Sequence, residues 1–271
     1  MKTILVPTDF SISAKNAADY AAQLALQFHA EIILLHAYHV PIPVTEVPII
    51  TITPDELQEA NESQLENEAI RLNKKTGVKI HINATMGMAV SEILEAEKKV
   101  DLIVMGIQGM GSFGEAIMGS VTTSLMRKSH KSILIVPLEA KFQKPKKIAL
   151  ACDYDPKMSQ HKLDMLKIFM KKFDSNLFLV QVKPKGELIN VDEAITGLNL
   201  EESLKEYPHD FYLITGDNPV EGINEFVNEH QLDLITVMPH HHNLLERLFH
   251  RSVSKRMAFH THVPILTLPE K

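Results

Sequence analysis

Short apolar stretches alternate with longer amphipathic stretches through the first half of the chain. Apolar runs of about 4–8 residues are typical of buried strands, and apolar positions three or four residues apart are typical of helices that pack on one face. The pattern predicts strands at Thr3–Pro7, Glu31–His36, Lys79–Ala84, Leu102–Met105 and Ser132–Val136. It predicts helices at Ser13–Phe28, Pro54–Thr76, Val90–Lys99 and Gly119–Ser129. This alternation favours an α/β fold with a mostly parallel sheet that helices cover on both faces.

Helix-start signals support the first two helices. Ser11 or Ser13 can cap the first helix, because a serine hydroxyl accepts from the unpaired amide groups at a helix start. Thr53 and Pro54, followed by acidic residues, are typical of the start of the second helix.

The second half of the chain repeats the first. The segment IALACD (Ile148–Asp153) repeats ILVPTD (Ile4–Asp9), and Asp233–Pro269 aligns with Asp101–Pro137 without a gap. The stretch Glu139–Lys147, which carries lysines and a proline, reads as a linker. We therefore expect two tandem, doubly wound α/β domains, residues 1–140 and 146–271, that pack as a pseudo-twofold pair.

The segment after the fourth predicted strand is rich in glycine. Glycines stand at positions 106, 109, 111, 114 and 119, and Gly119 opens a helix with Ser120, Val121 and Thr122. Glycine lets the backbone approach a ligand closely, and a helix start presents unpaired N–H groups toward negative charge. The segment therefore predicts a phosphate site.

The glycine spacing narrows this prediction. The pattern G-x2-G-x9-G-S, formed by Gly106, Gly109, Gly119 and Ser120, resembles that of nucleotide-binding universal stress proteins. The resemblance extends to ILVPTD, to MGMAVSEI (Met86–Ile93) and to ILIVP (Ile133–Pro137). It implies an adenine nucleotide alpha hydrolase-like fold of the universal stress protein type, with ATP bound in the first domain.

The resemblance also assigns residues to the ligand. In open parallel sheets ligands bind beyond the carboxyl ends of the strands where the strand order reverses. In universal stress proteins this point lies between the first and fourth strands, so the resemblance implies that Asp9 and Gly106 lie together. Residues at the ends of the first four strands are expected at the nucleoside: Pro7, Thr8, Asp9, His36, Ala37, Met86, Gly87, Met105 and Gly106. Residues around the fourth helix are expected at the phosphates: Gly109, Gly119, Ser120, Val121 and Thr122. A divalent cation, Mg²⁺ or Mn²⁺, would bridge phosphate oxygens.

Other interpretations of the same residues are simpler. The glycines could form a loop without a ligand, Asp9 could serve only the helix start, and Ser120 and Thr122 could be ordinary caps. A dinucleotide-binding motif is disfavoured because its glycines, 109, 111 and 114, follow the fourth strand rather than the first. The Gly-Lys-Ser/Thr of a P-loop and the protein-kinase signatures are absent from the sequence.

The second half differs where the phosphate motif stands in the first. Met238, His241 and Arg251 replace Gly106, Gly109 and Gly119, so we expect one nucleotide site per chain. Histidines 240–242, with histidines 250, 260 and 262, suggest zinc, but consecutive histidines point in different directions and a polar loop is favoured. Cys152 ends an apolar run and is expected in the core.

Composition limits the partners. A formal net charge of −6 argues against nucleic acid and anionic membranes, and one cysteine in 271 residues fits a reducing cytoplasm. No apolar run has transmembrane length, and the N-terminal run is too short for a signal peptide. The expected function is regulatory ATP binding. Slow ATP hydrolysis or phosphoryl transfer, and a nucleotide-free scaffold for a protein partner, are alternatives, and a homodimer stays open.

Overall fold

The computed structural model describes residues 1–39, 53–107, 119–151, 160–183, 186–187, 191–216, 219–238 and 262–269. The first half contains β1 (Thr3–Pro7), α1 (Ile12–Phe28), β2 (Glu31–Tyr38), α2 (Pro54–Thr76), β3 (Ile80–Met86), α3 (Ala89–Ala96), the 3₁₀ turn Glu97–Lys99, β4 (Leu102–Gly106), α4 (Ser120–Lys128) and β5 (Ser132–Val136). The second contains β6 (Lys147–Ala151), the 3₁₀ turn Gln160–Leu163, α5 (Asp164–Phe173), β7 (Asn176–Lys183), α6 (Val191–Leu204), β8 (His209–Thr215), α7 (Pro219–His230), β9 (Leu234–Val237) and β10 (Ile265–Thr267).

The helix and strand predictions for the first half are confirmed to within one or two residues. The third helix is the exception, because it ends at Ala96 and continues as a 3₁₀ turn to Lys99. Ser11, not Ser13, caps α1 by accepting from the Ala14 N–H. Thr53 and Glu56 form a reciprocal capping box at the start of α2.

The described strands form one ten-stranded sheet in the order β3-β2-β1-β4-β5-β10-β9-β6-β7-β8. Strands within each half are parallel, and β5 and β10 pair antiparallel in the middle. Each half therefore has the same strand order read from the outside inward. Leu134 and Leu266, which are equivalent in the two halves, pair directly with each other. Residues on a twofold axis must pair in this way, so the two α/β domains form a pseudo-twofold pair.

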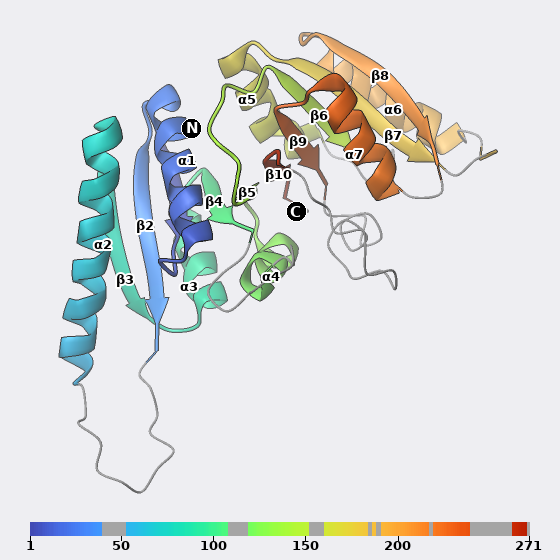
Figure 1. Ribbon diagram of the computed structural model, residues 1–271. Coiled ribbons are helices and arrows are strands. Elements are labelled where there is room, and N and C mark those ends of the chain that lie inside the picture. Colours follow the sequence, from blue (N-terminus) through green and yellow to red (C-terminus); the bar gives the residue numbers. More distant parts are fainter. Residues whose placement is uncertain are drawn as a thin grey trace, which may run out of the picture.

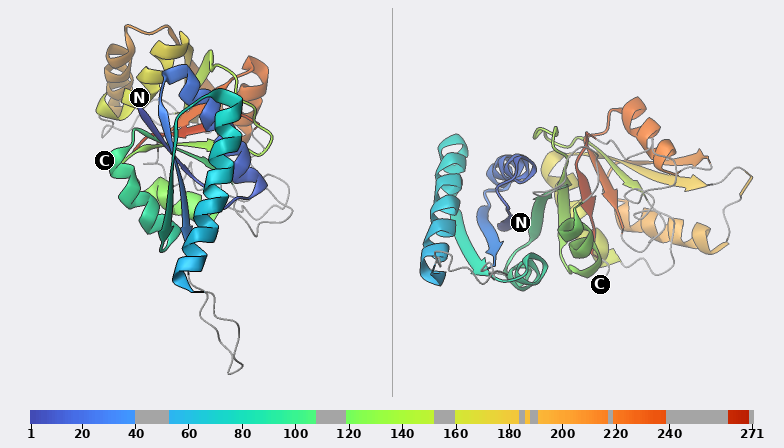
Figure 2. Two further views of the ribbon diagram at one scale, coloured as in Figure 1. Left: turned by 90° about the vertical axis from the view of Figure 1, so that its left-hand side faces the viewer. Right: turned by 60° about the horizontal axis from the view of Figure 1, so that its bottom comes forward.

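Helices cover both faces of this sheet (Figures 1 and 2). One apolar cluster joins α1, α2, α5 and α6 to one face, and a second joins α3, α4 and α7 to the other. Helices on both faces bury strands on both sides, so the apolar side chains of β4 and β5 are buried along their whole length.

Contacts across the pseudo-twofold axis hold the two domains together. The rings of Phe28 and Phe173, which end α1 and α5, meet edge to face with centroids 5.5 Å apart. The side chain of Asn16 on α1 donates to the carbonyl oxygens of Pro137 and Ala140 at 2.9 and 3.0 Å, which anchors the start of the linker. Tyr20 packs edge to face on Phe142 of the linker, and burial raises the pKa of Tyr20 far above its usual value.

Candidate functional site

The loop after β1 is held by β2. The Thr8 N–H donates to the Leu35 carbonyl oxygen at 2.8 Å. His36 Nδ1 lies 2.7 Å from the Thr8 carbonyl oxygen, which can only accept, so this nitrogen carries the proton. Thr8 is thus bonded through both backbone groups and is buried. The His36 side chain therefore holds this loop in place, whereas the sequence predicted only that His36 lies at the nucleoside.

A tight turn then directs Asp9 to the carboxyl edge of the sheet. Phe10 has a φ of 62°, an uncommon conformation for a residue other than glycine, and its ring packs on His36 with centroids 4.6 Å apart. The Thr8 hydroxyl accepts from the Phe10 N–H at 3.0 Å, and Asp9 Oδ1 accepts from the Ser11 N–H at 3.1 Å. Asp9 therefore stabilises the turn, while Ser11 performs the capping that was considered for Asp9.

The start of α4 lies beside the end of β4. The Gly119 N–H donates to the Ile107 carbonyl oxygen at 2.8 Å, so the chain leaves β4 and returns to α4 at neighbouring points. Residues 108–118, which include Gly109, lie outside the described residues. Gly119 is the N-cap and has no side chain to pair with the amide groups of the first turn. The amide groups of Ser120, Val121 and Thr122 belong to the class that a helix leaves without internal partners.

Two polar groups expected at a phosphate already have protein partners. The Gly119 N–H donates to the Ile107 carbonyl oxygen, and the Thr122 hydroxyl donates to the Gly106 carbonyl oxygen at 3.3 Å. Thr122 is only 3% exposed. The described groups at this helix start that can face an anion are therefore the backbone amides and the hydroxyl of Ser120, which is exposed.

Packing accounts for the glycine at position 106. A Cβ atom at Gly106 would lie 2.4 Å from the hydroxyl oxygen of Ser13 and 2.9 Å from its backbone carbonyl carbon and oxygen. Backbone atoms of α1 cannot move aside easily, so a side chain at 106 conflicts with α1 packing on β4. This reason differs from the close ligand approach inferred from sequence, and contact with a ribose remains a prediction.

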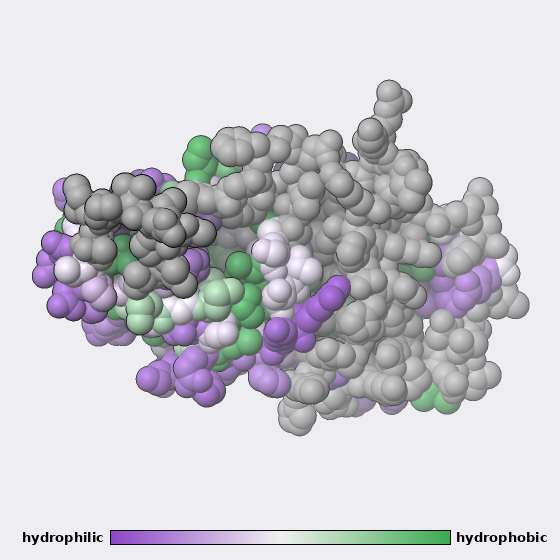
Figure 3. Space-filling model, turned by 90° about the horizontal axis from the view of Figure 1, so that it is seen from below, coloured by the Kyte–Doolittle hydropathy of each residue, from purple (hydrophilic) through white to green (hydrophobic). Residues whose placement is uncertain are grey.

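The turn after β3 borders the same edge. The Gly87 N–H donates to the Tyr38 carbonyl oxygen at 2.9 Å, which joins this turn to the end of β2. Met86 is 61% exposed, Ala37 is half-buried and Met105 is buried. Figure 3 views the molecule from below, the side toward which the arrows of β2 and β3 point in Figure 1, and apolar side chains are exposed there among polar ones.

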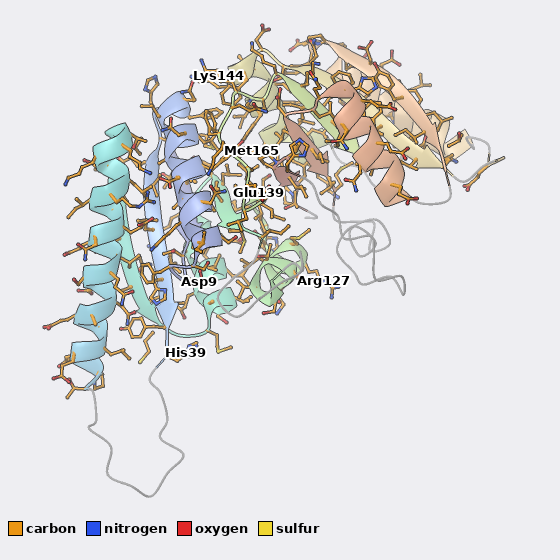
Figure 4. The ribbon with its side chains drawn as sticks, in the orientation of Figure 1. Asp9, His39, Arg127, Glu139, Lys144 and Met165 are labelled. Atoms are coloured by element: carbon orange, nitrogen blue, oxygen red, sulfur yellow. The ribbon has the colours of Figure 1, made fainter. Side chains whose placement is uncertain are left out.

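The direction of the helices makes the carboxyl edge of the first domain favourable for negative charge. α1, α3 and α4 all begin at the carboxyl edge, and a helix N-terminus carries a partial positive charge. Arg127 and Lys128 lie in the last turn of α4, where cations complement the negative end of the helix. Figure 4 labels Asp9 and Arg127, and Asp9 lies toward the lower end of the first domain.

The described side chains do not form a metal site by themselves. Within the described parts of the chain, no three histidine, cysteine or acidic side chains are grouped to hold a metal ion. Histidines 240–242, 250 and 260 lie outside those parts, as do Cys152 and Arg251. Met238, the counterpart of Gly106, is described and is buried in the core of the second domain.

The fold defines the class of protein: two repeated, doubly wound α/β domains that are joined by the antiparallel pairing of β5 and β10. The model of the Universal stress protein family matches residues 1–137 and again 145–269, so the chain belongs to this family. No described helix combines the length and the apolar character needed to cross a membrane.

Individual relatives agree with this assignment. Universal stress protein MJ0531 of Methanocaldococcus jannaschii is 31% identical over 151 residues, which are 54% of this chain and 84% of the relative. Universal stress protein MJ0577 of the same organism is 27% identical over 153 residues, covering 50% of this chain and 94% of the relative. The crystal structure of a universal stress protein from Archaeoglobus fulgidus superposes with a TM-score of 0.75, at 20% identity, over 99% of this chain and 98% of its own, which shows the tandem fold.

Proposed function

We propose that the first domain binds an adenine nucleotide across the carboxyl edge of β3, β2, β1 and β4. Phosphates bind the amide groups at the start of α4, and the nucleoside lies between the loop of Asp9 and the turn of Gly87. The observation that carries this proposal is the Gly119–Ile107 hydrogen bond, because it brings a helix start beside the end of β4. β4 pairs with β1, whose end leads to Asp9. The family and the spacing of the glycines support the same ligand.

The residues divide between the two ends of the ligand. Asp9 accepts from the adenine edge or the ribose. Ser120, Val121 and Thr122 offer backbone amides to the phosphates, and Gly109 contributes a further stretch of bare backbone. The remaining proposed contacts line the nucleoside: Pro7, Thr8, His36, Ala37, Met86, Gly87, Met105 and Gly106.

A divalent cation fits the phosphate end. Mg²⁺ and Mn²⁺ prefer hard oxygen ligands, and Mg²⁺ keeps several of its waters, so phosphate oxygens and water molecules form a suitable set. The cation offsets the charge of the phosphates.

ATP binding serves regulation in this proposal. A ligand that binds only the folded chain stabilises it by about 2.7 kcal/mol at a hundredfold excess over its dissociation constant. Slow hydrolysis or phosphoryl transfer is the second candidate, but Asp9 is assigned to the nucleoside end, away from the γ-phosphate where a base would act. A nucleotide-free scaffold is the third.

Two measurements test the assignment. Mass spectrometry of nucleotide retained through purification, followed by calorimetric titration of ATP with Mg²⁺, is expected to detect one adenine nucleotide per chain. Absence of binding at millimolar ATP rejects the proposal and favours the scaffold. Phosphate release in single-turnover and multiple-turnover experiments separates a regulator, which releases little, from an enzyme.

A further inference from the structure

The turn between β3 and α3 lies beside a carboxylate that the glycine pattern does not include. Glu92 lies in the first turn of α3, and its Oε2 accepts from the Thr85 hydroxyl of β3 at 2.8 Å. Its Oε1 lies 2.4 Å from the point where a Cβ atom on Gly87 would stand. The carboxylate therefore fills the space that a side chain at position 87 would need.

This arrangement ties three elements together at one point. Glu92 joins α3 to β3 through Thr85. Gly87 donates its N–H to the Tyr38 carbonyl oxygen, and His39 Nδ1 lies 3.4 Å from the Gly87 carbonyl oxygen. The Gly87 N–H thus contacts the last residue of β2 and its carbonyl oxygen contacts the residue that follows β2, while Glu92 occupies the place of a Cβ atom on Gly87. An acidic side chain is also favourable in the first turn of a helix, because the helix N-terminus is partially positive.

From this geometry we infer that Glu92 is a positioning residue for the nucleoside end of the site. The inference rests on the proposed function. Glu92 holds Gly87 against the end of β2, so that the backbone of the turn presents one surface to the base. The side chain acts through Thr85 and Gly87 and does not itself contact the ligand.

The residues around Gly87 explain why the turn needs the contact with Glu92. Met86 and Met88, on either side of Gly87, are 61% and 70% exposed, so their side chains contribute little packing to hold the turn. The position of Gly87 then depends on hydrogen bonds and on the contact with Glu92. Loss of one such hydrogen bond changes an equilibrium by about three- to tenfold.

Variants at three positions separate geometry from charge. Glu92→Ala and Thr85→Val remove the hydrogen bond and are each expected to weaken ATP and adenosine binding by about three- to tenfold. Glu92→Gln keeps the geometry, with its amide oxygen accepting from Thr85, and is expected to stay within about twofold of wild type. Inorganic tripolyphosphate, which occupies only the α4 end, is expected to bind all variants alike. Glu95→Gln is the matched control, because Glu95 lies on the same helix, is exposed and pairs only with Lys98 among the described contacts.

A double-mutant cycle tests the contact with Gly87 independently of any ligand. Gly87→Ala must displace Glu92 from Thr85, so it is expected to lower the midpoint of urea unfolding. In the Glu92→Ala background the same substitution is expected to have little effect, because the space is empty.

The outcomes distinguish this inference from the proposed function. Wild-type protein that binds ATP, together with unchanged adenosine affinity in Glu92→Ala, overturns the positioning role alone. An equal loss in Glu92→Gln and Glu92→Ala also overturns it, because charge would then matter rather than geometry. Wild-type protein that binds neither ATP nor adenosine overturns both.

Discussion

The two domains share their contacts at the amino ends of the parallel strands but differ at the carboxyl ends. At the amino edge, Asp101 accepts from the N–H groups of Lys2 and Thr3, and its counterpart Asp233 accepts from those of Lys146 and Lys147. An equivalent carboxylate thus accepts hydrogen bonds from the start of the first strand in each domain. This agreement indicates that these hydrogen bonds stabilise the fold rather than serve a ligand.

At the carboxyl edge the equivalent positions differ. His36 donates to Thr8 in the first domain, whereas Gln181, at the equivalent place in the strand register, is 1% exposed and its Oε1 has no hydrogen-bond partner among the residues that the structure describes. Gly106 gives way to Met238, which is buried. The comparison teaches that a common fold does not require a common carboxyl edge, and that binding chemistry is to be sought at the edge that differs.

The largest expected effect comes from copying the second domain into the first. Gly119→Arg introduces the residue of position 251, and the backbone at Gly119, with a φ of −61° and a ψ of 150°, has an extended conformation that residues other than glycine also adopt. We expect ATP affinity to fall by about a hundredfold or more, since the side chain covers the amide groups of the helix start. Calorimetry measures the affinity, and circular dichroism checks that the fold is intact. Unchanged affinity would contradict the assignment of the phosphate end.

Asp9→Ala is expected to weaken ATP and adenosine by about ten- to hundredfold, because hydrogen bonds to charged groups are worth about 1.5–3 kcal/mol. Tripolyphosphate binding is expected to stay unchanged. Asp9→Asn keeps an acceptor for the Ser11 N–H and controls for loss of the turn. Equal losses of ATP and tripolyphosphate would move Asp9 away from the nucleoside.

Gly106→Ala tests the packing explanation for this glycine. The added Cβ meets the backbone of Ser13, so we expect the free energy of unfolding to fall by about 1–3 kcal/mol in urea denaturation. Gly216→Ala is the matched control, because in the described parts of the chain no atom beyond Gly216 and its chain neighbours lies within 4 Å of the point where its Cβ would stand. A neutral Gly106→Ala would show that α1 does not exclude a side chain there.

The smallest effect is expected at His36. His36→Phe keeps an aromatic ring beside Phe10 and removes the donor to Thr8, which is expected to cost about 1 kcal/mol of unfolding free energy and a few-fold in ATP affinity. His36→Gln copies Gln181 and retains a donor, so its loss is expected to be smaller. Thermal unfolding with and without ATP compares the two variants. An equal loss in both would contradict a hydrogen-bonding role.

Much of the first domain could be predicted from sequence because its signals are local. The capping residues Ser11, Thr53 and Glu56 contact amide groups within their own helix starts, so their spacing along the chain is sufficient. The pairing of Leu134 with Leu266 agrees with the internal repeat, because two equivalent halves can pack about a twofold axis.

The parts of the site that sequence missed depend on contacts across strands. The hydrogen bond between His36 and Thr8 joins residues 28 positions apart, and no spacing rule connects them. Likewise, the backbone of Ser13 on α1 leaves no room for a side chain at position 106, and the Glu92 side chain fills the space beside position 87. A glycine in a sequence shows that a side chain is absent, but not whether a ligand or the protein itself occupies that space.

Sequence alone determined the alternation of strands and helices, the duplication and the glycine spacing that resembles nucleotide-binding members of the family, since each of these follows from local period or local similarity. The tertiary structure decided which donors near α4 are already bonded, which side chain holds the loop of Asp9, and which carboxylate lies against Gly87. These depend on the register of neighbouring strands and on the packing of helices over them, which bring distant residues within hydrogen-bond distance.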